Sequence, residues 1–202
     1  MNRLITCTVA SVGIAGAAHA DVARFDFEAA AAGPTTSLTV SDAGLSMSVR
    51  RGDSLEFQVL NSTGYPATWG HQAIAPFGVA TGDAFVMNFS MPVTRVTFET
   101  GDFGPGDSDL MATRAFSGQD ATGSEVDEGT YYYTEQMGLP NDVWVFELVA
   151  GAGESIRSVW FDSMDLHNNM SVIFDNVVVT FVPAPGTVGL ALLAAAVLRR
   201  KR

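Results

Sequence analysis

Hydrophobic and polar residues alternate along most of this chain, and this alternation constrains the fold more than any other feature of the sequence. A period of two places every second side chain on the same face of a β-strand, so it is typical of strands with one buried face. The alternating hydrophobic residues are Leu45, Met47, Val49, Phe85, Met87, Phe89, Val96, Phe98, Trp144, Phe146 and Leu148. No stretch between residues 33 and 182 keeps a helical period for ten residues. The sequence therefore predicts an all-β protein.

Glycine-rich segments separate the hydrophobic runs and set the expected number of strands. Residues 101–106 and 151–153 are two such segments, and turns are expected there. Beyond the alternating runs, we expect strands at residues 23–27, 37–40, 55–60, 156–161 and 172–182, and after Asp109. About ten short, evenly spaced strands are typical of a β-sandwich, with a jelly roll as the first candidate topology.

The first twenty residues have the composition of a secretory signal peptide. Arg3 supplies a positive charge, residues 4–18 are apolar or small, and Ala18-His19-Ala20 matches the small-x-small cleavage pattern. We therefore expect the mature chain to begin at Asp21 and to be exported; a buried N-terminal helix is the alternative. The one cysteine, Cys7, lies within this segment, so the expected mature chain has no disulfide.

The last residues of the chain combine a short apolar run with a basic end. Residues 186–198 carry no charge and would form a helix of about 20 Å, which is shorter than the roughly 30 Å of a bilayer core. Arg199, Arg200, Lys201 and Arg202 follow this run, and they are expected to stay on the cytoplasmic side. The pattern indicates a short transmembrane helix that anchors the protein only temporarily.

A proline motif, Val182-Pro183-Ala184-Pro185-Gly186, precedes the apolar run. Motif, apolar run and basic end together resemble the PEP-CTERM sorting signal of Gram-negative and related bacteria, with Ala184 in place of that family's usual glutamate. The resemblance implies that an exosortase-type protease cleaves at the motif and that the protein reaches the cell surface or the extracellular matrix. An ordinary C-terminal membrane anchor is the alternative.

We therefore expect three parts: a signal peptide at residues 1–20, one domain at residues 21–182 and a sorting signal at residues 183–202. The domain holds all 22 acidic residues but only six arginines, which gives it a net charge of −16. Such a charge repels nucleic acid and anionic lipid and attracts divalent cations. Frequent phenylalanine and valine argue against disorder. The sequence thus predicts a folded acidic domain that does not bind nucleic acid.

Two short segments at the ends of the domain resemble a known family. "RFDFE" opens the domain at residues 24–28 and "VIFDNVVVTFV" closes it at residues 172–182. The pair resembles the first and last strands of carbohydrate-binding-module-like jelly rolls. The resemblance implies that the terminal strands are neighbours, and that Asp26 or Glu28 forms a structural calcium site with Asp175 and Asn176. The alternative is that Asp175 and Asn176 make local backbone hydrogen bonds at a strand irregularity.

The densest group of carboxylates lies in "GDFGPGDSD", residues 101–109. Asp102, Asp107 and Asp109 fall within a glycine-rich loop, and the last two are spaced so that both side chains would share a face in extended backbone. Calcium takes six to eight oxygen ligands and tolerates irregular loops, so these three residues are a candidate calcium site. A solvated acidic turn is the alternative.

Several aromatic residues fall in polar or glycine-containing segments, where their rings are candidates for stacking on sugars. These candidates are Tyr65, Trp69, Tyr131 and Tyr132. In a strand, Tyr131 and Tyr133 would share one face while Tyr132 pointed away. The alternative is that Trp144 and Trp160 fill the core and the tyrosines border it.

These observations favour an exported, non-enzymatic protein with a structural or binding role in the extracellular polymer layer. The domain has two histidines, His71 and His167, and the sequence nominates no serine partner for a hydrolase triad. Two alternatives stay open: a lectin-like carbohydrate-binding module, and an extracellular glycoside hydrolase whose two carboxylates need not be close in sequence. The tetrapeptide Arg51-Gly52-Asp53-Ser54 is interpreted as a turn and not as a cell-adhesion motif.

Overall fold

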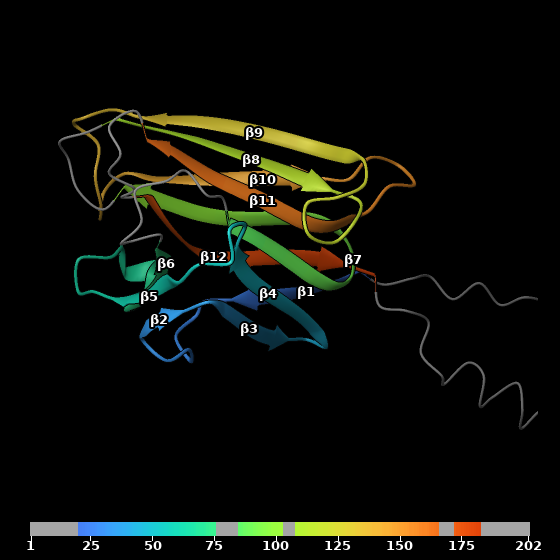
Figure 1. Ribbon diagram of the computed structural model, residues 1–202, viewed down its shortest axis with the longest axis horizontal. Helices are drawn as coiled ribbons and strands as arrows, with labels where there is room; N and C mark the ends of the chain where they lie inside the picture. Colours follow the sequence, from blue (N-terminus) through green and yellow to red (C-terminus); the bar gives the residue numbers. More distant parts are fainter. Residues whose placement is uncertain (1–19, 76–84, 103–107, 166–171, 183–202) are drawn as a thin grey trace, which may run out of the picture. The chain divides into compact units, whose positions relative to one another are not determined.

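The computed structural model describes residues 20–75, 85–102, 108–165 and 172–182 (Figure 1). The predictions for residues 1–19 and 183–202, which include most of the signal peptide, most of the sorting motif and the basic tail, lie outside the described residues. Within the described ranges, no helix is long and apolar enough to cross a membrane.

Twelve strands and one short 3-10 helix make up the described fold, where the sequence predicts about ten strands. The all-β prediction is confirmed. The elements are β1 (Asp21–Phe25), β2 (Gly33–Thr35), β3 (Ser37–Asp42), β4 (Leu45–Arg51), β5 (Phe57–Asn61), η1 (Ala67–Trp69), β6 (Gln72–Ala75), β7 (Phe85–Asp102), β8 (Asp109–Phe116), β9 (Glu125–Tyr133), β10 (Val143–Val149), β11 (Ile156–Asp165) and β12 (Val172–Phe181).

The strands form two antiparallel layers that share β7. Sheet A runs β10-β7-β12, and beyond β12 it continues to β1 at one end and to β6, β5 and β2 at the other. Sheet B has the order β3-β4-β7-β11-β8-β9. The prediction of a sandwich-like, antiparallel β fold is therefore confirmed.

The core lies between the two sheets and is built by the alternating residues. In β4, Leu45, Met47 and Val49 are fully buried, whereas the two serines between them are half-buried. The rings of Phe161 in sheet B and Phe174 in sheet A meet in a T-shaped arrangement, with their centroids 5.7 Å apart. Aromatic pairs of this geometry stabilise a fold beyond the area they bury. Such contacts hold the two sheets face to face.

β7 is one strand of 18 residues, where the sequence analysis predicts two (Figure 1, green). Its first half pairs with β4 and β11, and its second half pairs with β10 and β12. The partners change around Val93: the pairing with β11 shifts register between Asn88 and Val93, and the pairing with β12 shifts between Val93 and Arg95. Pro92 lies at the shift in the β11 pairing and directly before the shift in the β12 pairing, and proline is tolerated at such irregularities because it has no N–H to donate to a ladder. The chain thus passes from sheet B to sheet A without a turn.

The first and last strands of the domain are neighbours, as the resemblance to jelly rolls implies. β1 and β12 pair antiparallel over five residues, from Asp21 opposite Phe181 to Phe25 opposite Val177. β1 begins two residues before the expected start at Ala23, directly at the expected mature N-terminus. This pairing brings the segment after β1 close to the middle of β12.

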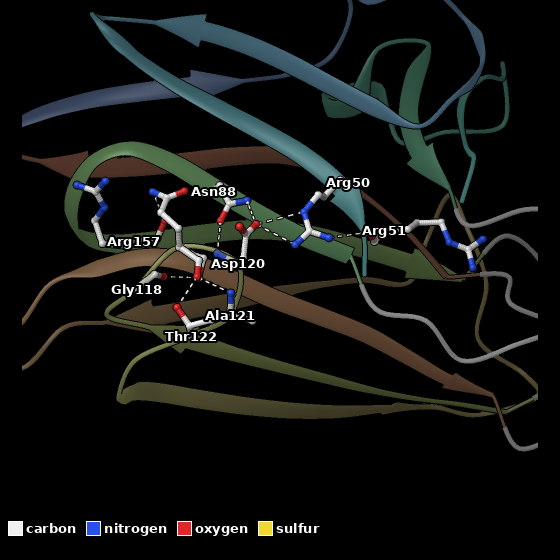
Figure 2. A network of polar contacts seen from close by, with 10 residues as sticks. Arg50, Arg51, Asn88, Gly118, Asp120, Ala121, Thr122 and Arg157 are labelled. Carbon is white, nitrogen blue, oxygen red and sulfur yellow. Dashed lines mark hydrogen bonds and ion pairs between the residues drawn. The ribbon is translucent and has the colours of Figure 1, made fainter. Parts of the chain in front are cut away.

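The loop between β8 and β9 is held against sheet B by a polar network (Figure 2). Asp120 Oδ1 accepts hydrogen bonds from Arg50 Nη2 and Asn88 Nδ2, both at 2.8 Å, and the Asp120 N–H donates to Asn88 Oδ1 at 2.7 Å. The Ala121 N–H donates to Ser158 Oγ at 3.0 Å. These bonds hold Asp120 and Ala121 at φ values of 57° and 56°. Left-handed backbone of this kind costs free energy in residues other than glycine.

The Arg51-Gly52-Asp53 sequence forms an internal ion pair. Arg51 is fully buried, its Nη2 lies 2.7 Å from Asp53 Oδ2, and its Nε donates to Asp53 Oδ1 at 3.1 Å. Arg51 Nη1 also donates to the Glu56 carbonyl at 3.3 Å. Residues 52–53 form the turn that the sequence analysis expects, and β5 begins at Phe57, two residues later than expected.

Candidate functional site

The outer face of sheet A carries a buried aspartate. Phe174 of β12 belongs to the core between the sheets, so its neighbour Asp175 points to the outer face. Asp175 is nonetheless fully buried. Tyr65 and Trp69, from the segment between β5 and β6, pack with Ile173 in a second, smaller hydrophobic cluster on this face. The carboxylate therefore lies between the sheet and a covering segment.

Three buried polar atoms in this region have no hydrogen-bond partner. They are both carboxylate oxygens of Asp175 and the hydroxyl oxygen of Tyr65. A buried polar atom without a hydrogen-bond partner destabilises the folded state by about 1–3 kcal/mol, and by more when it belongs to a charged group. Such atoms in a folded domain point to a bound water, ion or ligand that satisfies them.

The pKa values of both residues reflect this burial. Burial raises the pKa of Asp175 to about 8; the adjacent Asn176 backbone N–H offsets part of the shift, and the negative charges of Asp26, Glu28 and Glu99 add to it. Burial also raises the pKa of the Tyr65 hydroxyl to about 12, with a further contribution from Asp175. The region thus gathers negative charge around a carboxylate that water does not reach.

A bulge in β12 places Asn176 beside this carboxylate. The pairing of β12 with β7 shifts register between Asp175 and Val178, and Asn176 adopts a φ of 49°. Its Nδ2 donates to the Thr68 carbonyl at 3.0 Å and to Glu99 Oε2 at 3.2 Å. The strand irregularity that the sequence analysis names as the alternative is present. It also directs the Asn176 amide to the covering segment and to β7.

Asp26 and Glu28 follow β1 and are both exposed. Glu28 Oε1 accepts the backbone N–H groups of His71 and Gln72, each at 2.7 Å. Gly70 has a φ of 66°, and a Cβ there would lie 2.6 Å from Glu28 Oε1, so glycine is required for this approach. Glu28 therefore fixes the turn that leads into β6, while Asp26 makes one long bond, to the Glu28 N–H at 3.3 Å.

The residues around Asp175 fit a cation that prefers oxygen ligands. Calcium binds carboxylate and amide oxygens in irregular geometry, and the unpartnered oxygens of Asp175 are the kind of group that a cation neutralises. The predicted residues Asp26, Glu28, Asp175 and Asn176 do come together in one region. Among the described residues, no three His, Cys, Asp or Glu side chains already surround one point as metal ligands.

The other candidate calcium site differs from its prediction in one respect. Asp102 ends β7 and Asp109 begins β8, and both are fully buried, so the alternative of a solvated acidic turn is wrong for these two residues. The reason is that both belong to the strands and not to the loop between them. Asp107 lies outside the described residues.

Two of the four predicted sugar-stacking residues are buried. Tyr65 is 7% exposed and Trp69 1% exposed, because both cover Ile173 on the outer face of sheet A. Trp69 also donates its Nε1 hydrogen to Glu99 Oε2. The prediction that these two rings stack on a polymer is therefore wrong. Their segment looks like a polar loop in the sequence, but it forms the wall of the Asp175 region.

The exposed aromatic residues lie instead on the edge strands β9 and β10. Tyr131 and Trp144 stack with 3.9 Å between ring centroids and 9° between ring planes. Tyr131 and Tyr133 share a face, with their centroids 5.0 Å apart, which confirms the predicted alternation; Tyr132 is 47% exposed.

The alternative that Trp144 and Trp160 fill the core is wrong. Trp144 is 39% exposed, because it lies near the start of an edge strand, while Phe146 and Leu148 further along β10 are buried. Trp160 is half-buried on sheet B, with the guanidinium carbon of Arg114 5.5 Å from its ring centroid. Sequence reasoning missed Trp144 as a surface residue because its alternation matches that of the buried residues.

Comparisons with known proteins give the fold a context. No family model matches the chain, and no curated protein matches it. The K1 cleaved adhesin domain of Lys-gingipain from Porphyromonas gingivalis is similar at 15% identity and a TM-score of 0.45, covering 81% of this chain and 99% of that domain. A family 29 carbohydrate-binding module from Piromyces equi is similar at 4% identity and a TM-score of 0.39, covering 80% and 90%.

An arabinose-bound α-L-arabinofuranosidase is also similar, at 10% identity and a TM-score of 0.47. The match covers 78% of this chain but only 26% of that enzyme. At these values the likeness tells nothing about ligand or activity, and the fold assignment rests on the strand pairings described above.

Proposed function

We propose that this chain is an exported, non-catalytic domain that binds extracellular polysaccharide through the Tyr131–Trp144 pair. One observation carries the proposal: Trp144 is 39% exposed although its ring lies flat on Tyr131. A ring held by a neighbouring ring has little conformational freedom to lose on binding, and its other face offers a flat apolar surface to a sugar. A lectin-like role follows from this surface.

The position of the pair suits a polymer ligand. Among the described strands, β9 pairs only with β8, and β10 pairs only with β7, so both rings stand at the border of the sandwich. Val145 and Tyr132 beside them are also exposed. A polymer chain can run along this border without entering a closed cavity.

Retention of the full-length protein in polysaccharide-containing affinity gels tests this proposal. Trp144→Ala is expected to weaken binding at least about tenfold, which corresponds to about 1.4 kcal/mol. Leu55→Ala is the control, because Leu55 is 49% exposed in the segment between β4 and β5, away from the pair. Equal retention of Trp144→Ala and wild type, with both folded by circular dichroism, would refute the proposal.

The proposal includes the route by which the protein reaches its ligand. It is exported by the signal peptide, anchored by the short C-terminal helix, and cleaved by an exosortase-type protease at the motif of residues 182–186. The arrangement of motif, apolar run and basic end supports this route. The strand connections are those of a jelly roll, which the pairing of β1 with β12 supports.

The mass of the protein recovered from the cell exterior tests the route. The product is expected to begin at Asp21 and to end near Val182. A mass that still includes the last twenty residues would contradict removal of the anchor.

A calcium ion at Asp175 completes the proposal. It is supported by the two buried carboxylate oxygens that lack a partner and by the carboxylates of Asp26 and Glu28 nearby. The ion would neutralise Asp175 and tie the end of β1 to β12 and to the segment that carries Tyr65. Its role there is structural.

A further inference from the structure

A groove crosses the outer face of sheet A. It has a volume of about 280 Å³ and passes over four neighbouring strands, β1, β12, β7 and β10. The centres of four neighbouring strands span about 14 Å. At its β10 end the groove is lined by Val145, which directly follows Trp144 in the chain. The groove therefore ends at the border of the sandwich that carries the Tyr131–Trp144 pair.

The groove combines an apolar floor with a few polar side chains. Val178 of β12 is half-buried in it, Thr97 of β7 lies directly opposite Val178 in the strand pairing, and Val145 is 51% exposed. Binding sites for small ligands are mostly apolar, and a small number of polar groups fix the orientation of the ligand. The polar groups of this groove therefore indicate what kind of ligand it accepts.

The donor at the β1 end of the groove is Arg24. Its side chain is exposed and makes no ion pair or hydrogen bond with any described residue; only its backbone N–H is bound, by Asp42. Four other arginines each lie within ion-pair distance of a carboxylate: Arg50, Arg51, Arg95 and Arg114. A guanidinium carries five N–H donors in a planar fork. Arg24 can therefore donate to a ligand without first breaking a contact within the protein.

A fixed acceptor lies in the same groove, on β7. Glu99 Oε2 accepts hydrogen bonds from Trp69 Nε1 and from Asn176 Nδ2, the second at 3.2 Å. These bonds hold the carboxylate in place, and Glu99 Oε1 accepts no hydrogen bond from the part of the chain that the structure describes. Asp26 also lines the groove and is exposed. The groove thus offers both a donor and acceptors beside its apolar floor.

We propose that this groove binds an uncharged segment of the polysaccharide, whose hydroxyl groups donate to Glu99 and accept from Arg24. This inference rests on the proposed polysaccharide-binding function and extends its surface from the Tyr131–Trp144 pair across sheet A. A hydroxyl group both donates and accepts, so a sugar with several hydroxyls suits a groove that has both kinds of partner. The carboxylates of Asp26 and Glu99 repel a uronate, and the strongly acidic domain adds to this repulsion.

Affinity gel electrophoresis of the full-length protein tests the class of ligand. The probes are three soluble neutral polymers, which are mixed-linkage β-glucan, arabinoxylan and galactomannan, and one anionic polymer, polygalacturonate. At least one neutral polymer is expected to retard the protein, and polygalacturonate is not. Retardation should be the same in about 50 mM and about 500 mM sodium chloride, because salt screens only interactions between charges. Stronger retardation by polygalacturonate, retardation that falls with salt, or no retardation by any neutral polymer would overturn the inference.

Filling the groove tests its location. Val178→Phe places a ring on the floor of the groove and is expected to weaken binding of the neutral polymer at least about tenfold. Thr180→Phe is the matched control: Thr180 is the next residue of β12 on the same face and is also half-buried, but it does not line the groove. With both variants folded by circular dichroism, equal binding by Val178→Phe and Thr180→Phe would overturn the inference.

A substitution at the exposed Arg24 tests the donor without altering a half-buried position. Arg24→Ala is expected to weaken binding of the neutral polymer about three- to tenfold, which corresponds to the loss of a hydrogen bond to the ligand. Arg95→Ala is the control, because Arg95 is exposed on the same face, is paired with Glu147 at 2.8 Å and does not line the groove. Binding by Arg24→Ala as tight as by Arg95→Ala would overturn the role assigned to Arg24.

The groove and the aromatic pair can fail separately. If Trp144→Ala weakens retention and Val178→Phe does not, the aromatic surface is correct and the groove inference is wrong. If Val178→Phe weakens retention and Trp144→Ala does not, the groove is the binding site and the role of the pair is wrong. Weakening by both variants supports one continuous site, and weakening by neither contradicts both proposals.

Discussion

Asp42 and Arg24 join the edges of the two sheets: Asp42 Oδ2 accepts the backbone N–H of Arg24 at 2.8 Å. Asp42 lies on β3, at the border of sheet B, and Arg24 lies on β1, at the border of sheet A. On the other side of the sandwich, Asp127 of β9 accepts the backbone N–H of Val149 of β10, also at 2.8 Å. Free N–H groups on edge strands promote pairing with other chains. On each side of the sandwich, an aspartate of sheet B thus accepts a hydrogen bond from a backbone N–H on an edge strand of sheet A.

Removing either carboxylate is expected to destabilise the domain and to expose an edge. Asp42→Ala and Asp127→Ala should each lower the free energy of unfolding by about 1 kcal/mol, the contribution of one hydrogen bond. Urea denaturation measures this change, and sedimentation velocity should show more self-association than in wild type. Glu135→Ala removes an exposed carboxylate from the β9–β10 connection and serves as the control. Two variants as stable and as monomeric as this control would contradict the edge role.

The pH dependence of stability should report the Asp120 network. The hydrogen bonds from Arg50 and then Asn88 lower the pKa of Asp120 below its ordinary value of 3.8. A carboxylate with a lowered pKa in the folded state stabilises the fold above its unfolded pKa, and this contribution is lost as the pH falls through the folded pKa. The free energy of unfolding of wild type should therefore fall more steeply below pH 3.8 than that of Asp120→Asn. Parallel pH profiles for the two proteins would rule out this contribution.

Substitution by glycine should stabilise the domain at Ala121, in a turn, and destabilise it within a strand. Ala121 has a φ of 56°, where a side chain costs free energy and glycine does not. Ala121→Gly is expected to raise the free energy of unfolding by about 0.5 kcal/mol, whereas Ala112→Gly within β8 is expected to lower it by about 0.5–1 kcal/mol. Urea denaturation of both variants measures the difference in sign. Destabilisation by Ala121→Gly would show that the left-handed turn carries no strain.

Much of the fold follows from local patterns. The alternation of Leu45, Met47 and Val49 is sufficient to predict β4 and its buried face, because burial on one side of a strand has a period of two. The continuity of β7 does not follow from that pattern. Pro92 and the register shifts beside it mark a change of partner strands, which is decided by tertiary pairing and not by the local sequence.

The candidate site was predicted in part. The terminal segments identified Asp26, Glu28, Asp175 and Asn176, because a resemblance carries information on which distant segments meet. Trp69 was expected at the surface but is buried, whereas Trp144 follows the pattern of the buried residues but is exposed. Alternation gives the face on which a side chain lies, but it does not tell whether that part of the chain lies at the edge of a sheet or under a covering segment.

The central claim is that the buried carboxylate of Asp175 holds a cation. Asp175→Asn keeps the size of the side chain and removes its charge. In EDTA the variant is expected to be more stable than wild type, because a buried carboxylate without a partner costs free energy. In calcium the order should reverse, because a ligand that binds only the native state stabilises it.

Thermal unfolding of wild type and Asp175→Asn, each in millimolar calcium and in EDTA, tests most directly whether Asp175 holds a cation. The wild-type Tm should be higher in calcium by about 2–4 °C for each kcal/mol of binding free energy, and the Tm of Asp175→Asn should be the same in both media. A wild-type Tm that is equal in calcium and in EDTA would contradict the claim.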